Sequence, residues 1–459
     1  MRISRNYLQI IFYLILVLSS IFRAANTNLL IQFFFIGFAS FFLLCNFNKN
    51  ISSEIKYNFR KNKFFFIPLF LVLIYTIIQI IPFPIETFGQ YFSIHLELIN
   101  NLELSKKFIT ISVDPSNTYF QILNFLNLII IFSLVPALFN KNKDIMNLLL
   151  LFGIIGAFHA FFATYWLLIG NPSNAFIIKE FYLNAASGFF INRSNFSIFL
   201  LLCAFASLYF INFYIKLNNF KLNFLEQLNS PIIYQRFFIL FITIGIVMTL
   251  SRAGNFSYIL MLNLIILSSF FITKKIFNSV FNTIVLILVI DIAFIGFYFG
   301  GSQLIDRYSI FNDFKEQLDS TSDYTRLTMI KFGFEKFKEF FLLGYGAGGF
   351  EQIFKIYYNI VSGVYSNHVH NDPVEFLGEF GVIGSLLLIY LLISYFVLIM
   401  KSVKKKELTS LHPILILILF STLFVNSMVD FSLHIPAIQY FLCTLAAIGL
   451  SKFKKQIIF

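Results

Sequence analysis

Long apolar runs, separated by short polar or basic segments, fill this chain from end to end. A helix needs about 20 apolar residues to cross a hydrocarbon core about 30 Å thick. We therefore expect about 12 transmembrane helices, at residues 7–22, 29–47, 64–83, 119–140, 145–170, 189–214, 237–250, 256–273, 277–300, 378–400, 411–429 and 434–451.

The first apolar run resembles a secretory signal peptide, because Arg2 and Arg5 precede it. However, Arg23-Ala24-Ala25 is a poor cleavage site, and a second apolar run follows at once. We expect the first run to be retained as a membrane helix.

Composition favours the same class of protein. Hydrophobic residues make up 58% of the chain and charged residues 12%, and the mean hydropathy is +0.81. Soluble domains usually carry about twice that share of charge. We therefore predict an all-α polytopic membrane protein. Residues 1–459 should form a single domain, because no repeat of fixed period and no Pro- or Gly-rich linker divides them.

Basic residues predict the orientation in the membrane. Lysine and arginine gather in alternate polar segments, at residues 1–6, 48–63, 141–144, 215–236, 274–275, 401–410 and 452–459. The positive-inside rule assigns these segments and both termini to the cytoplasm, and the long segment 301–376 to the opposite face. The net charge of +12 fits anchoring against anionic lipid. A nucleic-acid partner is not expected, because no soluble basic patch with interleaved aromatic residues is present. The cysteines, which all lie in predicted spans, are expected to be inert: Cys45, Cys203 and Cys443.

The long outer segment contains an amphipathic pattern and a glycine-rich turn. At residues 320–341, charged residues alternate with apolar ones spaced three or four apart, which predicts a helix lying along the bilayer surface. Residues 344–349 then hold four glycines in six positions, which permits a tight turn with positive φ. A plain turn is the favoured interpretation, and contact between its backbone N–H groups and a phosphate is the alternative. The apolar positions of the helix are Leu327, Ile330, Phe334, Phe337 and Phe341.

Polar residues crowd the end of this segment, in a chain with only six histidines. Burying such a cluster is costly without a function. Asp372 as N-cap, Pro373 at the first helical position and Glu375 at the third resemble a capping box. His370 would then lie just before a helix N-terminus, where the dipole disfavours the imidazolium and keeps a neutral nitrogen available as a general base.

Two structural interpretations compete with that role. His370 and His368 could simply cap neighbouring backbone groups. The His-x-His pair with Asp372 could also bind zinc, although no further cluster supplies a convincing set of ligands.

Other polar residues are predicted at the same face. Arg252 interrupts an apolar stretch between two spans, and Arg193 follows Asn192 at the start of another. Either arginine could snorkel to the interface, but a guanidinium also suits a phosphate or pyrophosphate. Asp430 lies with His434 between the last two spans.

Asp291, within the predicted span 277–300, is one more polar position. It is a functional candidate or a partner for a nearby hydroxyl or amide.

The order of these motifs resembles the O-antigen ligase and polysaccharide polymerase superfamily. The motifs are SRAG at 251–254, LGYGAGGF at 343–350, HVHND at 368–372 and EFLGEFGVIG at 375–384. GFFINRSN at 188–195 and VDFSLHIPA at 429–437 are similar to its exopolysaccharide-polymerase-like branch. The resemblance covers residues 185–450. It implies a GT-C-like membrane glycosyltransferase in the bacterial inner membrane, which moves a glycan from undecaprenyl pyrophosphate to an acceptor hydroxyl at the periplasmic face.

Residue chemistry agrees with that implication. Arg252 and Arg193 would hold the pyrophosphate, and Arg326 would close over the donor. His370 would take the acceptor proton, and displacement at the anomeric carbon would invert it, without a metal or cofactor. The remaining candidates would orient His370 or the substrates: His368, Asn371, Asp372, Asn192 and Asp430.

Two questions stay open at this level. A lipid-linked oligosaccharide flippase or another transporter would also fit the number of spans, but transporters concentrate intramembrane charge in paired helices and show repeat symmetry. Among transferases, the acceptor could be lipid A core, a growing glycan or, in a protein O-oligosaccharyltransferase, a protein.

Overall fold

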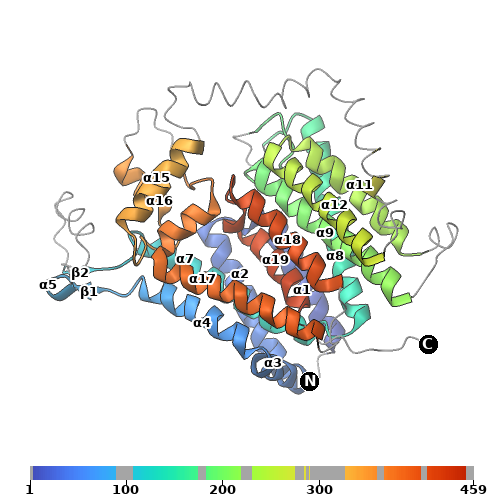
Figure 1. The fold of residues 1–459 in the computed structure, drawn as a ribbon, viewed down its shortest axis with the longest axis horizontal. Coiled ribbons are helices and arrows are strands. Elements are labelled where there is room, and N and C mark those ends of the chain that lie inside the picture. The colour runs from blue at the N-terminus through green and yellow to red at the C-terminus, as the bar shows by residue number, and fades with distance from the viewer. Residues whose placement is uncertain are drawn as a thin grey trace.

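The computed structural model describes residues 4–88, 107–173, 182–218, 230–273, 326–358, 366–404 and 411–450, with 284, 285 and 289 (Figure 1). Two predicted features lie outside these ranges apart from residues 284, 285 and 289. They are the span 277–300, with Asp291, and residues 301–325 of the outer segment. The secondary structure of the described part consists of helices and one short strand pair, β1 (Phe83–Pro84) with β2 (Phe108–Ile109). The predicted all-α class is therefore confirmed, and every other predicted span coincides with a helix. The main helices of the described residues are α1 (Arg5–Ile21), α2 (Asn28–Phe47), α3 (Lys49–Lys61), α4 (Lys63–Ile78), α7 (Pro115–Leu138), α8 (Asn142–Leu168), α9 (Arg193–Asn218), α11 (Ile232–Met248), α12 (Arg252–Thr273), α15 (Arg326–Glu339), α16 (Phe350–Tyr357), α17 (Asp372–Lys404), α18 (Leu411–Ser427) and α19 (Pro436–Ile448).

The predicted number of spans is not confirmed. Among the described residues, 5 helices are long and apolar enough to cross a membrane: α2, α7, α8, α9 and α17. The pair α3 and α4, bent by 88° at their junction, would make a sixth. The shorter apolar helices α1, α11, α18 and α19 have 17 residues or fewer, which at 1.5 Å per residue is less than about 26 Å.

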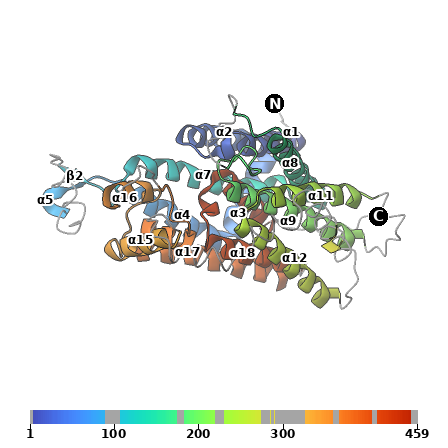
Figure 2. The ribbon, with the colours of Figure 1, turned by 90° about the horizontal axis from the view of Figure 1, so that it is seen from above.

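The helices form a bundle in which α7 and α9 are the inner members. α7 contacts α2, α4 and α19, whereas α9 contacts α8, α11 and α19. Figure 2 shows α1, α2 and α8 along one side of the bundle and α15, α17 and α18 along the other. Within the apolar window of α9, 83% of residues are buried. This burial explains its continuous run of apolar residues, since helices cover nearly all of its surface.

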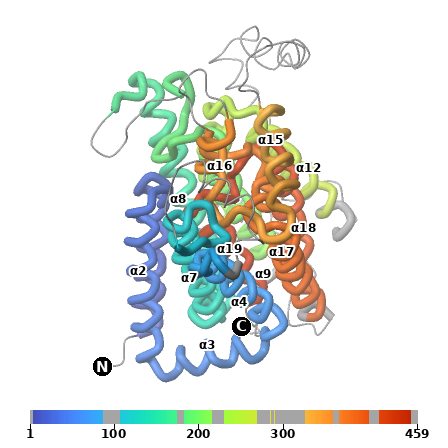
Figure 3. The backbone as a smooth tube through the Cα atoms, turned by 90° about the vertical axis from the view of Figure 1, so that its left-hand side faces the viewer, coloured from blue at the N-terminus to red at the C-terminus, as the bar shows by residue number. Residues whose placement is uncertain are grey.

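One end of the bundle carries basic residues. Figure 3 shows α3 running across this end, between α2 and α4. Arg5 bonds Glu54 of α3 at 2.7 Å, and Lys401 of α17 lies 5.4 Å from the ring centroid of Phe64. Near the end of α19, Ala446 O accepts from Tyr395 Oη of α17. The start of α1 and the end of α19 therefore lie at the same end of the bundle, away from the start of α17.

A break in α17 joins the outer segment to the bundle. Gly381 has φ +60, and the break frees the carbonyls of the preceding turn. Gly378 O accepts from Tyr345 N at 2.9 Å, and Glu379 O accepts from Gly346 N at 3.1 Å. The expected glycine-rich turn is confirmed, with positive φ at Gly344, Gly346 and Gly348.

The amphipathic helix of the outer segment is present as α15, but the predicted apolar stripe is only partly its packed face. Phe337 is buried and Ile330 is partly buried, whereas Leu327, Phe334 and Phe341 are exposed. Met329 and Phe332, which the predicted stripe did not include, are buried against α16 and α17. The helix has apolar residues on two faces, and a count of three-or-four spacings cannot tell which of them meets protein.

Candidate active site

The first turn of α17 brings the histidine loop, residues 366–371, onto the bundle. The predicted capping residue is wrong by one position. Asn371 is the N-cap, because its Oδ1 accepts from Val374 N at 3.0 Å. Asp372 is therefore the first residue of the helix and points inward, fully buried.

Three carboxylates line one face of this helix. Asp372, Glu375 and Glu379 are spaced by three and four residues, which places them above one another on a helix. All three are buried, and all face His434, in the short turn η3 (Ser432–His434) between α18 and α19. Unpaired buried carboxylates are very costly, so a cation buried among them would stabilise this arrangement.

His434 supplies that cation. Its Nδ1 donates to Asp372 Oδ1 at 2.6 Å, and its Nε2 lies 3.6 Å from Glu375 Oε1 and 3.6 Å from Glu379 Oε2. The ring stacks on Phe376 with centroids 4.4 Å apart. Burial alone would lower the pKa of His434, but the three carboxylates outweigh it, so its pKa lies well above the usual range. His434 thus links the start of α17 to η3.

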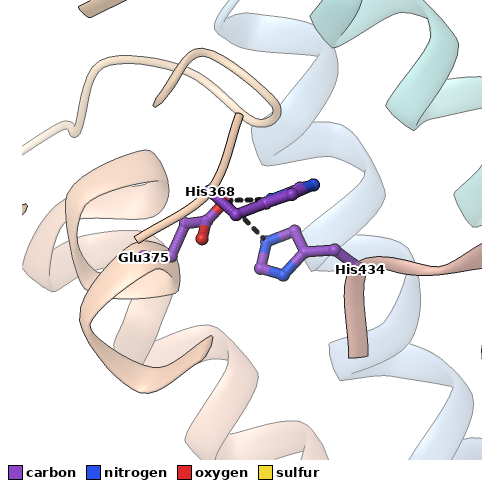
Figure 4. Close-up of side chains that lie close together, drawn as sticks. All are labelled: His368, Glu375 and His434. Carbon is purple, nitrogen blue, oxygen red and sulfur yellow. Dashed lines mark hydrogen bonds and ion pairs between the residues drawn. The ribbon is translucent and has the colours of Figure 1, made fainter. Parts of the chain in front are cut away.

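Glu375 also fixes the histidine loop. Its Oε1 pairs with His368 Nδ1 at 2.7 Å, and its Oε2 accepts from Val369 N at 2.8 Å. The His368 ring stacks on Phe431, with centroids 4.2 Å apart. Figure 4 shows His368 and His434 converging on Glu375 from two different segments.

His368, Glu375 and His434 are also close enough to hold a metal ion, with one ligand atom of each within 4.8 Å of the others. Two imidazoles and one carboxylate are a common donor set for transition metals. In the arrangement observed, a hydrogen bond already joins His368 to Glu375. A metal ion would have to displace the proton of that bond.

His370 adopts an unusual conformation. Its φ is +61, a left-handed conformation that costs a non-glycine residue about 1–2 kcal/mol. The side chain is 27% exposed, but its Nδ1 is buried without a hydrogen-bond partner in the described part of the chain. Burial lowers the pKa of His370; Asp430 opposes this shift, and Arg326 and His368 add to it. The lowered pKa agrees in direction with the neutral imidazole expected from the sequence, and its leading cause is burial; the role of His370 as a base stays a prediction.

The glycine-rich turn uses its amides inside the protein. Gly348 N donates to Glu379 Oε1 at 2.7 Å, and Ala347 N donates to Gln79 Oε1 at 3.1 Å. The amides of the other turn residues donate to backbone carbonyls. The phosphate-contact alternative is therefore wrong for this arrangement, and the plain-turn interpretation holds.

Arg193 and Arg252 begin two helices that meet at this end of the bundle. They are the first residues of α9 and α12, and the neighbouring side chains are joined, since Ser251 Oγ donates to Ser194 Oγ at 3.1 Å. Asn192 Oδ1 accepts from Ser194 N at 2.8 Å, so Asn192 caps α9. Two long helices thus direct their positive ends, each with an arginine, toward one region.

A polar network connects this arginine pair to η3. Ser432 Oγ donates to Asn195 Oδ1 at 3.1 Å and accepts from Asn426 Nδ2 at 3.2 Å. Leu433 N, the next residue, donates to Asp372 Oδ2 at 3.1 Å. The start of α9 and the start of α17 are therefore held to the same short turn.

Arg326 lies on the other side of that turn. Its Nη1 donates to Val429 O at 3.1 Å, next to Asp430, and it is among the charges that act on His370. Asn371 Nδ2 donates to Met428 O at 2.8 Å. Arg326 is exposed, so a ligand can reach it beside His370.

The structure therefore brings His368, His370, Asn371, Asp372 and Asp430 together, with Arg326 beside them. Arg193, Arg252 and Asn192 lie at two neighbouring helix starts that the polar network joins to the same turn. Sequence reasoning noted His434 without a role, treated Glu375 only as a cap and missed Glu379. The spacing of Asp372, Glu375 and Glu379 was the signal for a shared helix face, but their common partner is distant in sequence.

Residues 237–389, from α11 into α17, match the family model described as O-antigen ligase. The resemblance to the O-antigen ligase superfamily is thereby confirmed. The match includes Arg252, Arg326 and the histidine loop, whereas Arg193 and η3 lie outside it. No curated protein matches the chain.

Proposed function

We propose that this O-antigen ligase-related chain is a membrane glycosyltransferase that moves a glycan from undecaprenyl pyrophosphate to an acceptor hydroxyl. A membrane enzyme of ligase or polymerase type follows from the family match and the apolar helices. The transfer chemistry rests on one observation: a partly exposed histidine with a lowered pKa, His370, lies at a face that also holds Arg326 and two arginine-bearing helix starts.

In the proposed reaction, His370 Nε2 takes the proton of the acceptor hydroxyl. The acceptor oxygen forms a bond to the anomeric carbon, and the bond from that carbon to the pyrophosphate oxygen breaks. Undecaprenyl pyrophosphate leaves with the electron pair, and the anomeric carbon is inverted. His370 suits this role because its Nδ1 is buried while the ring is 27% exposed, which leaves Nε2 for the substrate.

The leaving pyrophosphate needs positive charge. Arg193 and Arg252 would supply it together with the N-termini of α9 and α12, because the first N–H groups and the dipole of a helix favour anions there. Arg326 would cover the donor from α15. Asn192, Asn371 and Asp372 hold these segments in place through the hydrogen bonds described above. This charge arrangement needs no metal ion, and we propose a metal-independent transfer.

The direct test is transfer by the purified protein in lipid nanodiscs, with undecaprenyl-pyrophosphate glycan as donor. Lipid A core, free glycan repeat units and a serine-rich peptide are offered separately, with and without EDTA. A new glycosidic product on one acceptor, formed equally with EDTA, is expected, and the acceptor identifies the subclass. Donor movement across vesicles without any product would instead indicate a flippase, and loss of activity with EDTA would contradict metal independence.

Replacing Arg252 with lysine tests the pyrophosphate site. Lysine keeps the charge but offers no planar fork, so transfer should fall about tenfold or more, the factor that corresponds to about 1.4 kcal/mol of transition-state binding. Steady-state rates at equal amounts of folded protein measure this change. Lys331→Arg, an exchange of the same two residue types on an exposed position of α15, is the control. Unchanged rates in Arg252→Lys would reduce Arg252 to an interface anchor.

The proposed orientation places the histidine loop in the periplasm and both termini in the cytoplasm. In a variant without Cys45, Cys203 and Cys443, a cysteine at Lys355 on α16 should react with an impermeant thiol reagent in cells whose outer membrane is permeabilised. A cysteine at Lys141, exposed between α7 and α8, should react only after the inner membrane is opened. The reverse pattern would invert the topology.

A further inference from the structure

We propose that Asp430 is the positioning residue for His370. Its carboxylate accepts a hydrogen bond from His370 Nδ1–H, which fixes the tautomer and stabilises the imidazolium formed during transfer. This role rests on the proposed function of His370 as the base. It differs from the substrate-orienting role expected for Asp430 from the sequence.

Two unsatisfied groups face each other at this point. His370 Nδ1 lies 4.0 Å from Asp430 Oδ1. Within the described ranges, neither His370 Nδ1 nor Asp430 Oδ2 has a hydrogen-bond partner, and both atoms are buried. Buried polar atoms are nearly always paired. An approach of about 1 Å would bring Nδ1 to hydrogen-bonding distance of Oδ1, and a rotation of the carboxylate would let Oδ2 take that place and satisfy both unpaired atoms. Such bonds are often long before substrate binds and tighten in the reacting complex.

Asp430 is held rigidly enough to act as a guide. Its side chain is fully buried, and Oδ1 accepts from Phe431 N at 2.9 Å. Its carbonyl accepts from Asp372 N at 3.3 Å. Phe431 lies between the histidines, stacked on His368 and edge-on to His370 with centroids 4.9 Å apart. The aspartate is therefore carried by the same turn that packs the histidine loop.

No other carboxylate of the described residues is placed for this task. The charged and titratable groups that act on His370 are Asp430, Arg326, His368 and Glu375. Glu375 is already engaged by His368 and by Val369 N. Arg326 and His368 oppose a positive charge on His370. Asp430 alone can balance the imidazolium without breaking an existing bond.

The chemical consequence is specific. With the Nδ1 proton directed at Asp430, Nε2 carries the lone pair that accepts the acceptor proton. When that proton arrives, the imidazolium lies against the carboxylate, and the proton leaves to solvent after product release. An amide at position 430 would place an NH₂ group against Nδ1 and favour the tautomer that is protonated on Nε2, which cannot act as a base.

The test is Asp430→Asn in the nanodisc transfer assay. We expect kcat to fall on the order of 10²-fold or more, as when a general base is disabled, with little change in KM for either substrate. The pKa of His370 should also fall, because the carboxylate raises it. The acid limb of the residual kcat/KM profile, where the base loses activity by protonation, should therefore move to lower pH. A raised KM with unchanged kcat and pH profile would overturn the proposal and favour substrate orientation.

Glu54→Gln, a carboxylate-to-amide change at the opposite end of the bundle, is the matched control and should leave kcat unchanged. The asparagine side chain of Asp430→Asn retains an oxygen for Phe431 N, so the variant should fold.

Site-resolved labelling of His370 with diethyl pyrocarbonate across pH gives a readout without turnover. An unshifted titration of His370 in Asp430→Asn would overturn the proposal. Suppose that the unmodified protein transfers glycan and His370→Ala does not. Unchanged kinetics in Asp430→Asn would then contradict only the role of Asp430 and would leave the proposed function standing. A wild type inactive on every acceptor contradicts the proposed function and this inference with it.

Discussion

Replacing His370 with alanine is expected to reduce glycan transfer by about 10²- to 10⁴-fold, the usual contribution of a general base. The change removes the partly exposed imidazole whose Nδ1 faces Asp430. It leaves the helix starts that carry Arg193 and Arg252 in place, so binding of the lipid-linked donor should persist. Transfer rates and binding of labelled donor, measured on the same nanodisc preparation, separate the two effects.

His368→Ala provides the comparison for that variant. His368 pairs with Glu375 and stacks on Phe431, so it supports the loop without facing Asp430. We expect a milder loss of rate. Because His368 adds to the lowering of the His370 pKa, the acid limb of the pH profile should move to higher pH, opposite to the shift expected for Asp430→Asn. The opposite result, a wild-type rate in His370→Ala and a loss of rate in His368→Ala, would make His368 the base. It would also contradict the positioning role of Asp430, which depends on His370 being the base.

Replacing His434 with alanine is expected to cost about 3–5 kcal/mol of stability, the usual effect of removing one partner from a buried ion pair. The variant leaves Asp372, Glu375 and Glu379 buried around an empty position. It also releases η3 from α17. Thermal unfolding of the purified protein in detergent, followed by circular dichroism or intrinsic fluorescence, measures the loss.

Lys355→Ala serves as the control, because it removes one partner of the more exposed pair with Glu351 on α16. Exposed pairs contribute about 0–1 kcal/mol.

The stability difference should also depend on pH, because the pKa of His434 is raised in the folded protein. The stabilising effect of His434 is fully present below its unfolded pKa of about 6.5. It is lost as pH rises through the raised pKa of the folded state. The stability difference between wild type and His434→Ala should therefore narrow at alkaline pH. A difference that stays constant with pH would mean that His434 acts through packing on Phe376 alone.

The His434 network also explains how His370 can hold its backbone conformation. A left-handed histidine persists only where its surroundings fix it more firmly than the strain opposes. Glu375 holds Val369 N on one side of His370, and Asn371 is held by Met428 and Val374 on the other. Loss of His434 should therefore reduce transfer as well as stability.

The amino-acid sequence alone determined the helical class, the positions of most described helices and the resemblance to the O-antigen ligase superfamily. These features depend on local properties: runs of apolar residues, the arginines that begin α9 and α12, and the HVHND motif before a helix. It also placed His370 just before a helix N-terminus. It placed the N-cap at Asp372 because Asp, Pro and Glu match a capping box, whereas Asn371 caps the helix and Asp372 turns inward to His434.

Only the tertiary structure decided which of these residues act on one another. Asp372 and His434 are 62 positions apart in the sequence, and no spacing rule relates them. The pairing arises because α17 and α19 begin at the same end of the bundle, and η3 then carries His434 and Asp430 to the histidine loop. Helix lengths also differed from the expected spans, because hydropathy records only that a segment is apolar and does not say where its helix begins and ends. Pairwise contacts, burial and the resulting pKa of His370 come from packing between distant segments, which a single sequence does not encode in any local pattern.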